Sequence, residues 1–324
     1  MKNSSPLVSI LVPFYNPGIF FKKTIASLEG LNYPNIEYIF IDDGSTDDSC
    51  KYLEDFSRPY ELLTQNNQGV LNLATTINKC LLKASGEYVQ MFPSDDLIYK
   101  NKLSKQVEIF DELPSVCLVF SKMHIIDKDD RIVAYSFSPT SIKLNSVLTN
   151  EDLLPVFVSN YFLSQPTTLI RTSLLRKIGG FCQPNNLYAE DLPTHLALLK
   201  EGDFYFQDEF TAAYRIHDKQ MTNLYSEKMI MSDFLYIESW SMSQLPHFRN
   251  PKKLEYNLKV SRHKALLRVL IRKPTGYFVY TQALRMSPFN PKSFCIFLIA
   301  SFVHVLKLFF PRLVMYRLRR TCKP

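Results

Sequence analysis

The sequence predicts an α/β fold in which a mostly parallel sheet is flanked by helices. Three observations support this prediction: short apolar runs alternate with segments of helical spacing along residues 7–92, the runs are apolar along their whole length, and acidic residues directly follow two of them. Strands of this kind are typical of parallel sheets, because helices bury both of their faces.

The first elements each have a clear signature. Residues Leu7–Phe14 (LVSILVPF) form a continuous β-favouring run that ends at a Pro/Asn/Gly cluster, and Ile19–Leu31 has the apolar spacing of a helix. A second buried strand at Ile36–Ile41 ends in Asp42–Asp47 (DDGSTD), whose carboxylates and hydroxyls can cap a helix around Ser49–Phe56. These segments form two strand–helix units.

The same alternation continues along the chain. We predict a third strand at Tyr60–Thr64, a helix at Asn72–Lys83 and a fourth strand at Glu87–Phe92. Residues 97–240 are predicted to be mixed α/β, with a helix at Lys102–Phe110, strands at Val116–Ser121 and Thr168–Arg171, and a helix from about Leu192 to Lys200.

The composition is that of a folded protein with an uneven charge distribution. Of 324 residues, 46% are apolar and 21% are charged, which is enough to bury a large core and excludes a disordered chain. From Arg249 to Pro324 there are 17 Lys or Arg and one acid, giving +16, whereas residues 1–248 hold 21 basic and 30 acidic residues, giving −9. We therefore divide the chain into a main domain, residues 1–245, and a basic, partly apolar, helical C-terminal extension, residues 246–324.

The extension contains an apolar segment of 18 residues, Ser293–Phe310, close to the ~20 needed to span a bilayer. Crossing once would translocate the basic tail, against the positive-inside bias, and His304 and Lys307 add to the insertion penalty. We expect a segment in the membrane interface or a helical hairpin, with a buried core or oligomer helix as the alternative. No nucleic-acid partner is expected, because no binding module accompanies the charge.

The cysteines and the N-terminus bear on localisation. The six cysteines lie far apart and form no CxxC pair, as expected of reduced thiols in the cytosol. The start of the chain lacks a small-residue cleavage site, so we expect no secretory signal. Together with the extension, this predicts a cytoplasmic protein peripherally associated with the inner face of the cell membrane.

Acidic residues follow two strands where ligands of such sheets gather, beyond the carboxyl ends. Asp42 and Asp43 follow the second strand, and Asp95 and Asp96 follow the fourth. Carboxylates here suit a phosphate ligand with a divalent cation, because the cation offsets the repulsion between the two kinds of anion. Asp95 and Asp96 are the best metal candidates, and the alternative is that Ser94-Asp95-Asp96 only caps the helix that follows.

Motifs between about Val8 and Thr222 resemble, in order, those of family 2 glycosyltransferases with the GT-A fold. They are Val12-Pro13-Phe14-Tyr15-Asn16 (opening nucleotide loop), Ile41–Asp47 (DDGSxD turn), Asn67-Gln68-Gly69 through Ile77-Asn78 and Ala84-Ser85-Gly86-Glu87-Tyr88 (the stretch before the metal strand), Ser94-Asp95-Asp96 (DxDD), Gly179-Gly180-Phe181 (GGF), Glu190-Asp191 (ED) and Tyr214-Arg215-Ile216-His217 (YRxH). The resemblance implies a GT-A type, Rossmann-like sheet and an inverting, nucleotide-sugar-dependent transferase.

The resemblance also implies a donor site. Asp43 would accept a hydrogen bond from the imide of a uracil-type base, with the other nucleotide-binding residues around it: Pro13, Phe14, Tyr15, Asn16 and Asp42. Asp95 and Asp96 would hold the ribose and a Mg²⁺ or Mn²⁺ ion that bridges the diphosphate, and His217 would add a ligand. A divalent cation suits this place, because it stabilises the negative charge of the departing nucleoside diphosphate.

For catalysis the resemblance implies that Asp191 is the general base, supported by Glu190, although the reverse assignment stays open. A positioned carboxylate raises the reactivity of an alcohol, which is a poor nucleophile at neutral pH. Two structural alternatives stay open as well: Glu190-Asp191 as merely a helix N-terminus, and His217 as an exposed loop histidine.

We therefore expect a metal-dependent transferase that moves a sugar from a nucleotide-diphosphate donor, with a UDP-sugar as the expected donor, to a hydroxyl of a glycan acceptor in surface polysaccharide biosynthesis. For a membrane-tethered enzyme the family leads us to expect an acceptor built on a lipid carrier. Pro93 at the first position of the DxDD motif supports an alternative, a catalytically inactive nucleotide-sugar-binding assembly partner at the membrane. Asp191→Asn separates the two, since it should abolish transfer but keep donor binding.

Overall fold

The computed structural model describes residues 5–136, 138–159, 161–184, 187–224, 227–252 and 254–258. The chain divides into two compact units, Met1–Leu154 with Tyr161–Leu224, and Pro155–Asn160 with Tyr225–Pro324. The first unit contains the sheet, and the second contains the long helix α8 (Glu227–Gln244). The predicted boundary at residue 245 stays a prediction, because most of the extension, including Ser293–Phe310, lies outside the described residues.

Ten described strands form one sheet in the first unit. They are β1 (Val8–Phe14), β2 (Ile36–Asp42), β3 (Tyr60–Thr64), β4 (Tyr88–Met91), β5 (Leu97–Ile98), β6 (Val116–Ile126), β7 (Ile132–Tyr135), β8 (Ser146–Leu148), β9 (Leu169–Arg171) and β10 (Asp203–Arg215). The order is β3-β2-β1-β4-β9-β6-β10-β5, with β7 on β6 and β8 on β10.

The strand directions decide where functional side chains meet. β1 is parallel to both β2 and β4, and β2 is parallel to β3. β9 is antiparallel to both β4 and β6, and β10 is parallel to β6. Six strands, β1 to β4, β6 and β10, therefore run the same way and end at one edge of the sheet. The predicted mostly parallel sheet flanked by helices is confirmed, with β5, β7, β8 and β9 as its antiparallel members.

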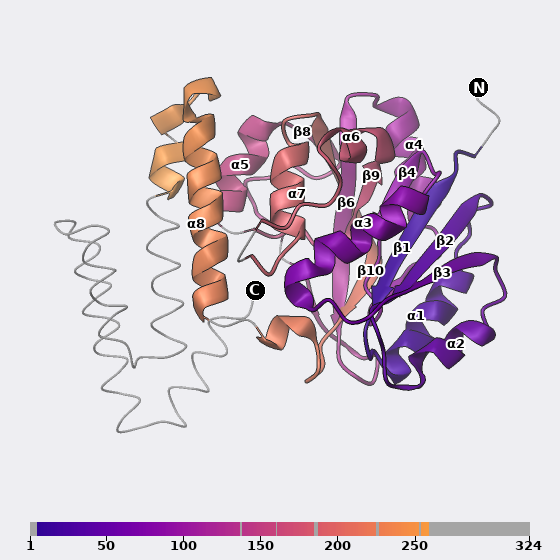
Figure 1. Ribbon diagram of the computed structural model, residues 1–324. Coiled ribbons are helices and arrows are strands. Elements are labelled where there is room, and N and C mark those ends of the chain that lie inside the picture. Colours follow the sequence, from indigo (N-terminus) through magenta and orange to yellow (C-terminus); the bar gives the residue numbers. More distant parts are fainter. Residues whose placement is uncertain are drawn as a thin grey trace. The chain divides into compact units, whose positions relative to one another are not determined.

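The described helices are α1 (Ile19–Glu29), α2 (Lys51–Glu54), α3 (Leu73–Lys83), α4 (Lys102–Glu112), α5 (Asn150–Ser159), α6 (Thr172–Lys177), α7 (Asp191–Leu198) and α8. α3 packs on β1 and β2 and lies in front of the sheet in Figure 1. The helix predicted at Ser49–Phe56 is shorter than expected: a 3₁₀ turn, Asp48–Cys50, precedes α2, and Asp47 caps it by accepting a hydrogen bond from the Ser49 amide at 3.0 Å.

The apolar character of β1 follows from burial on both faces. Val8, Ile10 and Val12 belong to a cluster with residues of α1 and α4, such as Phe21 and Leu103. Leu11, whose side chain points to the opposite face, is also fully buried. The strand therefore cannot alternate between apolar and polar residues, and this is why its sequence is a continuous apolar run.

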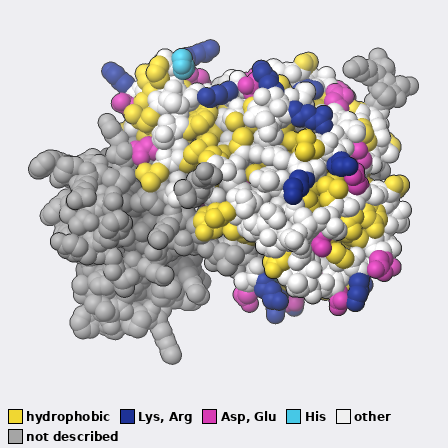
Figure 2. Space-filling model, in the orientation of Figure 1, with side chains coloured by type: hydrophobic (Ala, Val, Ile, Leu, Met, Phe, Trp, Pro, Cys, Tyr) yellow, Lys and Arg dark blue, Asp and Glu magenta, His cyan; other side chains and the backbone are white. Residues whose placement is uncertain are grey.

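One face of the described residues carries a mixture of charged side chains. On the face drawn in Figure 2, Lys and Arg side chains lie interspersed with Asp and Glu and with apolar groups, and do not gather into one basic patch. The predicted absence of a nucleic-acid partner is not tested by this view and stays a prediction.

Candidate active site

The carboxyl ends of the six co-directional strands place the predicted motifs at one edge of the sheet. Phe14 at the end of β1 is level with Asp42 at the end of β2, and Asp42 is level with Thr64 at the end of β3. The DxDD segment follows β4, and the YRxH segment ends β10. Ligands of α/β sheets bind at this edge, so the topology supports the site that the sequence predicts.

Asp43 is held by residues that follow β3. Its Oδ1 accepts hydrogen bonds from Nε2 of Gln65, at 2.5 Å, and from the Gln68 amide, at 3.0 Å. Gly44 has φ +79°, and an added Cβ would lie 2.7 Å from the Asn67 nitrogen, so only glycine fits this turn. The carboxylate is therefore oriented before any ligand binds.

Asn16 ties the loop after β1 to the turn after β2. Its Oδ1 accepts from the amides of Thr46, at 2.7 Å, and Asp47, at 3.1 Å. Asn16 itself has φ 47°, a left-handed conformation that asparagine tolerates better than most residues. Next to it, Tyr15 is 52% exposed and Pro13 is partly exposed, so both can contact a ligand.

Phe14 and Asp42 are both buried. Phe14 is 3% exposed and stacks on Phe21 at 4.6 Å between ring centroids, so its side chain belongs to the core. Asp42 is 8% exposed, and its Oδ1 accepts from the Ser45 amide at 2.8 Å. Both side chains shape the loops at this end of the sheet, and the predicted contacts of Phe14 and Asp42 with a nucleotide stay predictions.

Asp95 and His217 meet at the edge of the sheet. Oδ2 of Asp95 lies 3.0 Å from Nε2 of His217, although the residues are 122 positions apart in the sequence. The His217 side chain is 10% exposed and its ring lies 4.5 Å from that of Phe20, so His217 is not the exposed loop histidine of the alternative interpretation. The pair presents a carboxylate oxygen and an imidazole nitrogen, both metal-ligand types.

Asp96 is held by the backbone of β10. Its side chain is fully buried, and its Oδ1 accepts from the Arg215 amide at 2.8 Å. Burial and the neighbouring Asp95 raise the pKa of the Asp96 carboxyl well above its ordinary value. Its Oδ2 is buried and has no hydrogen-bond partner among the described residues, so the prediction that Asp96 ligates a metal stays a prediction, while Oδ1 holds the turn that presents Asp95. The capping alternative is wrong, because α4 begins at Lys102 with Asn101 at its N-cap position.

Arg215 fixes the same turn from β10. The residue is fully buried, and its Nε donates to the Asp95 carbonyl at 2.8 Å. Its guanidinium also forms an ion pair with Asp130 in the β6–β7 hairpin and lies over the ring of Phe20, 5.0 Å from the centroid. These contacts join β10, the hairpin and the turn after β4.

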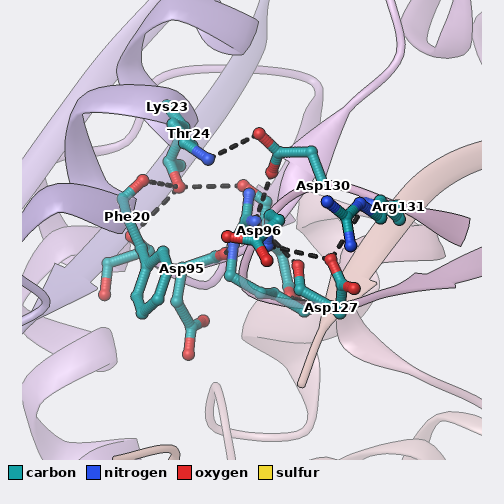
Figure 3. Close-up of polar contacts among 11 residues, drawn as sticks. Phe20, Lys23, Thr24, Asp95, Asp96, Asp127, Asp130 and Arg131 are labelled. Carbon is teal, nitrogen blue, oxygen red and sulfur yellow. Dashed lines mark hydrogen bonds and ion pairs between the residues drawn. The ribbon is translucent and has the colours of Figure 1, made fainter. Parts of the chain in front are cut away.

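Helix α1 supports the turn from the other side. Figure 3 shows Lys23 and Thr24 of α1 directed toward Asp130 and Asp96. The Thr24 hydroxyl donates to the carbonyls of Asp96, at 2.8 Å, or Ser94, at 3.0 Å, and Lys23 forms an ion pair with Asp130 at 2.5 Å. The turn is thus held by elements distant in sequence.

Glu190 and Asp191 begin α7. Asp191 accepts a hydrogen bond from the Leu192 amide at 2.7 Å through Oδ1, as expected at a helix N-terminus. Burial raises the pKa of Asp191 to about 6 and, together with the Asp191 charge, the pKa of Glu190 to about 8. At neutral pH the pair therefore consists of an ionised Asp191 and a largely protonated Glu190, a carboxylate beside a carboxylic acid.

The loop that leads to α7 is attached to the start of α3. Asn78 accepts from the Phe181 amide at 2.8 Å and donates to the Phe181 carbonyl at 2.9 Å. Gln183 accepts from the Ala74 amide at 3.0 Å and donates to the Val70 carbonyl at 2.8 Å. Because Val70 follows the segment that holds Asp43, these bonds connect the ED motif with the nucleotide turn.

Two side chains near Asp191 could not be assigned from sequence. The Tyr161 hydroxyl lies 2.5 Å from Nδ1 of the buried His195, and the interaction of Tyr161 with the Asp191 carboxylate lowers the pKa of that group. The signal in the sequence was weak: His195 stands four residues after Asp191, on the same face of a helix, but Tyr161 is separated from both by 30 residues or more.

No group of three or more His, Cys, Asp or Glu side chains in the described ranges is arranged to hold a metal ion. None of the helices in those ranges has the length and apolar character needed to cross a bilayer.

Comparisons with known proteins agree with the motifs. The sequence model for Glycosyl transferase family 2 matches residues 9–179. A putative teichuronic acid biosynthesis glycosyltransferase, TuaG of Bacillus subtilis strain 168, is 30% identical over 229 residues, which cover 69% of this chain and 84% of TuaG.

Solved structures show the same fold. Residues 1–349 of TarS from S. aureus, in complex with UDP-GlcNAc, superpose with a TM-score of 0.59 at 20% identity, covering 91% of this chain and 80% of that one. The mannosyltransferase PcManGT from Pyrobaculum calidifontis, in complex with GDP-Man and Mn²⁺, gives a TM-score of 0.54 at 14% identity, covering 96% and 89%. The sheet and its helices are therefore those of GT-A glycosyltransferases.

Proposed function

Because the chain belongs to glycosyl transferase family 2 and is a glycosyltransferase, we propose that it moves a sugar from a UDP-sugar to a hydroxyl of a glycan acceptor, with inversion, in surface polysaccharide biosynthesis. The observation that carries the proposal is the approach of Asp95 Oδ2 to His217 Nε2, at 3.0 Å, on the sheet edge that also bears Asp43. On the acceptor side of the proposed site, the ionised Asp191 would act on the acceptor hydroxyl.

The proposed donor is a UDP-sugar. Asp43 is a hydrogen-bond acceptor whose orientation is set by Gln65 and Gln68, and it suits the imide donor of a uracil base. Pro13 and Tyr15 supply accessible surface beside it. The TarS structure with UDP-GlcNAc supports the same class of donor, and the sugar itself is left to a screen.

The residues present fit a divalent cation. Asp95 and His217 would hold it, with diphosphate oxygens completing its shell, an arrangement typical of Mg²⁺ and Mn²⁺, which bind through few protein groups plus substrate phosphates. A bound cation supplies charge that stabilises the departing nucleoside diphosphate. The Mn²⁺ in PcManGT supports this assignment. Arg215, Asp96 and Thr24 keep the Asp95 turn in place for it.

Asp191 is the proposed general base. Its pKa of about 6 leaves it ionised at neutral pH yet basic enough to take a proton from the acceptor hydroxyl. Glu190, whose pKa is about 8, stays protonated and therefore does not compete as the base. Attack of the hydroxyl from the face opposite the nucleotide gives inversion, and the proton that leaves the hydroxyl ends on Asp191.

The proposed setting is the cytoplasmic face of the cell membrane. The TuaG relative supports a role in surface polysaccharide biosynthesis. The basic extension at residues 246–324 would bring the enzyme to anionic lipids and to an acceptor built on a lipid carrier. Truncation after about residue 291 should move the protein from the membrane pellet to the soluble fraction, and an unchanged distribution would contradict this part of the proposal.

The main test is a screen of nucleotide-sugars in the presence of Mg²⁺ or Mn²⁺. Binding is measured by thermal stabilisation of the protein, and transfer is then measured by the release of nucleoside diphosphate. A UDP-sugar should stabilise the protein only with the cation present. Asp191→Asn should keep that stabilisation and lose transfer. Equal turnover by wild type and Asp191→Asn would refute the assignment of the base.

A further inference from the structure

Tyr161 connects two side chains of α7. Its hydroxyl lies 2.5 Å from Nδ1 of His195, and its interaction with the Asp191 carboxylate lowers the pKa of that group. Asp191 and His195 are four residues apart, so they project from the same side of the helix. Tyr161 comes from a different segment, between α5 and β9, and therefore fixes the first turn of α7 from outside the helix.

The positions of the protons follow from burial and charge. His195 is fully buried, and burial lowers its pKa to about 3, so the imidazole is neutral and carries one N–H. An ionised Asp191 can only accept hydrogen bonds, so the single proton of the Tyr161 hydroxyl must point to it. Nδ1 of His195 must then carry its proton and donate to the Tyr161 oxygen.

The remaining nitrogen of His195 agrees with this arrangement. Nε2 is buried and has no hydrogen-bond partner among the described residues. In the arrangement above it is an unprotonated acceptor, and a buried acceptor is left unpaired more readily than a buried N–H. The ring also packs edge-on against Phe204, with centroids 6.4 Å apart, which restricts its rotation.

We propose that Tyr161 and His195 are positioning residues for the general base: His195 orients the Tyr161 hydroxyl, and Tyr161 holds the Asp191 carboxylate in the orientation and ionised state that proton abstraction requires. The proposal rests on the proposed function, in which Asp191 is the base. His195 acts through Tyr161, because its Nδ1 is committed to the tyrosine oxygen and the whole side chain is buried.

The other titratable groups around Asp191 do not replace this role. Glu190 precedes it on the same turn and is 4% exposed. Because the pKa of Glu190 is about 8, it is largely protonated where Asp191 is ionised. The Leu192 amide occupies Oδ1 of Asp191 but belongs to the same helix, so it cannot fix the carboxylate relative to the rest of the fold.

The test measures the Asp191 carboxyl directly and needs no substrate. Carboxyl ¹³C shifts of full-length protein labelled at aspartate are followed against pH, and Asp191 is assigned by the signal lost in Asp191→Asn. Tyr161→Phe removes one hydrogen bond to a charged group, so the Asp191 pKa should rise by about one unit. Tyr135→Phe, at a 60% exposed tyrosine of β7, is the matched control and should leave it unchanged.

A pair of substitutions at position 195 separates positioning from packing. His195→Phe keeps the ring and its contact with Phe204 but removes the donor, so the Asp191 pKa should rise. His195→Asn loses the ring but can place an amide N–H near the position that Nδ1 occupies in the wild type. The Asp191 pKa should therefore return toward the wild-type value. The pH profile of transfer should shift in the same direction as the pKa in each variant.

Two results would overturn the proposal: an Asp191 pKa that Tyr161→Phe leaves unchanged, or His195→Phe and His195→Asn that are both indistinguishable from wild type. Failure of the proposed function has a different signature. If Asp191→Asn retains transfer, Asp191 is not the base, whereas the titrations still report whether Tyr161 and His195 hold its carboxylate.

Discussion

Arg215 donates a hydrogen bond from Nε to the backbone carbonyl of Asp95, at 2.8 Å, from a fully buried position on β10. The contact joins the residue proposed to bind the cation to the strand that leads to His217. Because Asp96 accepts from the backbone amide of Arg215 as well, the turn cannot move without breaking bonds to both the backbone and the side chain of this buried residue. The geometry of the donor site therefore depends on a residue that does not need to touch the donor.

Arg215→Lys should weaken the fold and the cation site together. A lysine has one point charge and cannot reproduce the planar set of donors that reaches Asp95 and Asp130. We expect unfolding free energy to fall by about 3 kcal/mol in chemical denaturation, the scale of breaking a buried ion pair.

Lys23→Ala is the matched control for Arg215, since Lys23 binds the other oxygen of Asp130. Its side chain is 35% exposed, so the loss should stay below about 1 kcal/mol. Equal losses from the two variants would show that Arg215 does not anchor the turn.

His217→Gln should reduce cation binding while the fold is retained. The imidazole nitrogen beside Asp95 is replaced by an amide, a weaker ligand, and we expect Mn²⁺-dependent thermal stabilisation with UDP to be lost and transfer to fall at least about 10-fold. His247→Gln, at an exposed histidine of the second unit, should behave as wild type. A full Mn²⁺ response in His217→Gln would remove His217 from the cation site.

The sequence predicts those strands and helices whose burial follows one regular pattern along their whole length. β1 and α3 lie within about a residue of the predicted bounds, because β1 is buried on both faces and α3 is regularly amphipathic. β10 was not predicted: its run includes Gln207, Asp208 and Glu209, and its register with β6 shifts there, so the polarity does not follow one period. Such a strand is specified by its neighbours in the sheet.

The candidate site shows a similar limit. The motifs identify Asp95 and Asp96 as equivalent carboxylates, and only the position of Arg215, more than a hundred residues later, directs Asp96 inward. Tyr161 carries no local pattern that connects it with Asp191, because the two meet through tertiary packing. Motif spacing could therefore locate the site, but the division of its residues between ligand contact and support required the fold.

Gly180→Ala should destabilise the protein more than Gly179→Ala. Both glycines have positive φ, +95° and +92°, so both variants carry backbone strain. Only at Gly180 would the added Cβ meet a side chain, 2.4 Å from Oδ1 of Asn78, which is itself bonded to Phe181. We expect an additional loss of about 1–3 kcal/mol in unfolding free energy at Gly180. Equal losses would mean that Asn78 adjusts freely.

The rate of transfer should depend on the ionisation of Asp191. The base must be ionised, so kcat should be level above about pH 7, half-maximal near its pKa of about 6, and fall about tenfold per pH unit well below it. Rates measured at saturating donor in a constant-ionic-strength buffer series check this. A profile that stays level down to pH 4 would indicate a base with an ordinary carboxyl pKa.

Asp191→Asn should make the protein more stable but inactive. The pKa of Asp191 is about 6 in the folded state, against an ordinary value of 3.8, so the folded state binds this proton more tightly than the unfolded state. Stability contributed by the group is therefore lost as pH rises from about 4 to about 6, and the full cost of the buried charge is present above that range. Asparagine cannot ionise and avoids this cost.

We expect Asp191→Asn to gain about 1–3 kcal/mol in unfolding free energy at pH 8, and little or nothing at pH 4, where aspartate in the folded state is protonated. Chemical denaturation of both proteins at the two pH values measures the difference. Asp152→Asn, at a carboxylate that serves the exposed turn before α5, is the control and should not gain stability at pH 8. A gain at pH 8 together with lost transfer would identify Asp191 as a charge kept for function at the expense of stability, whereas a loss of stability at pH 8 would show that its carboxylate is held mainly as a structural cap of α7.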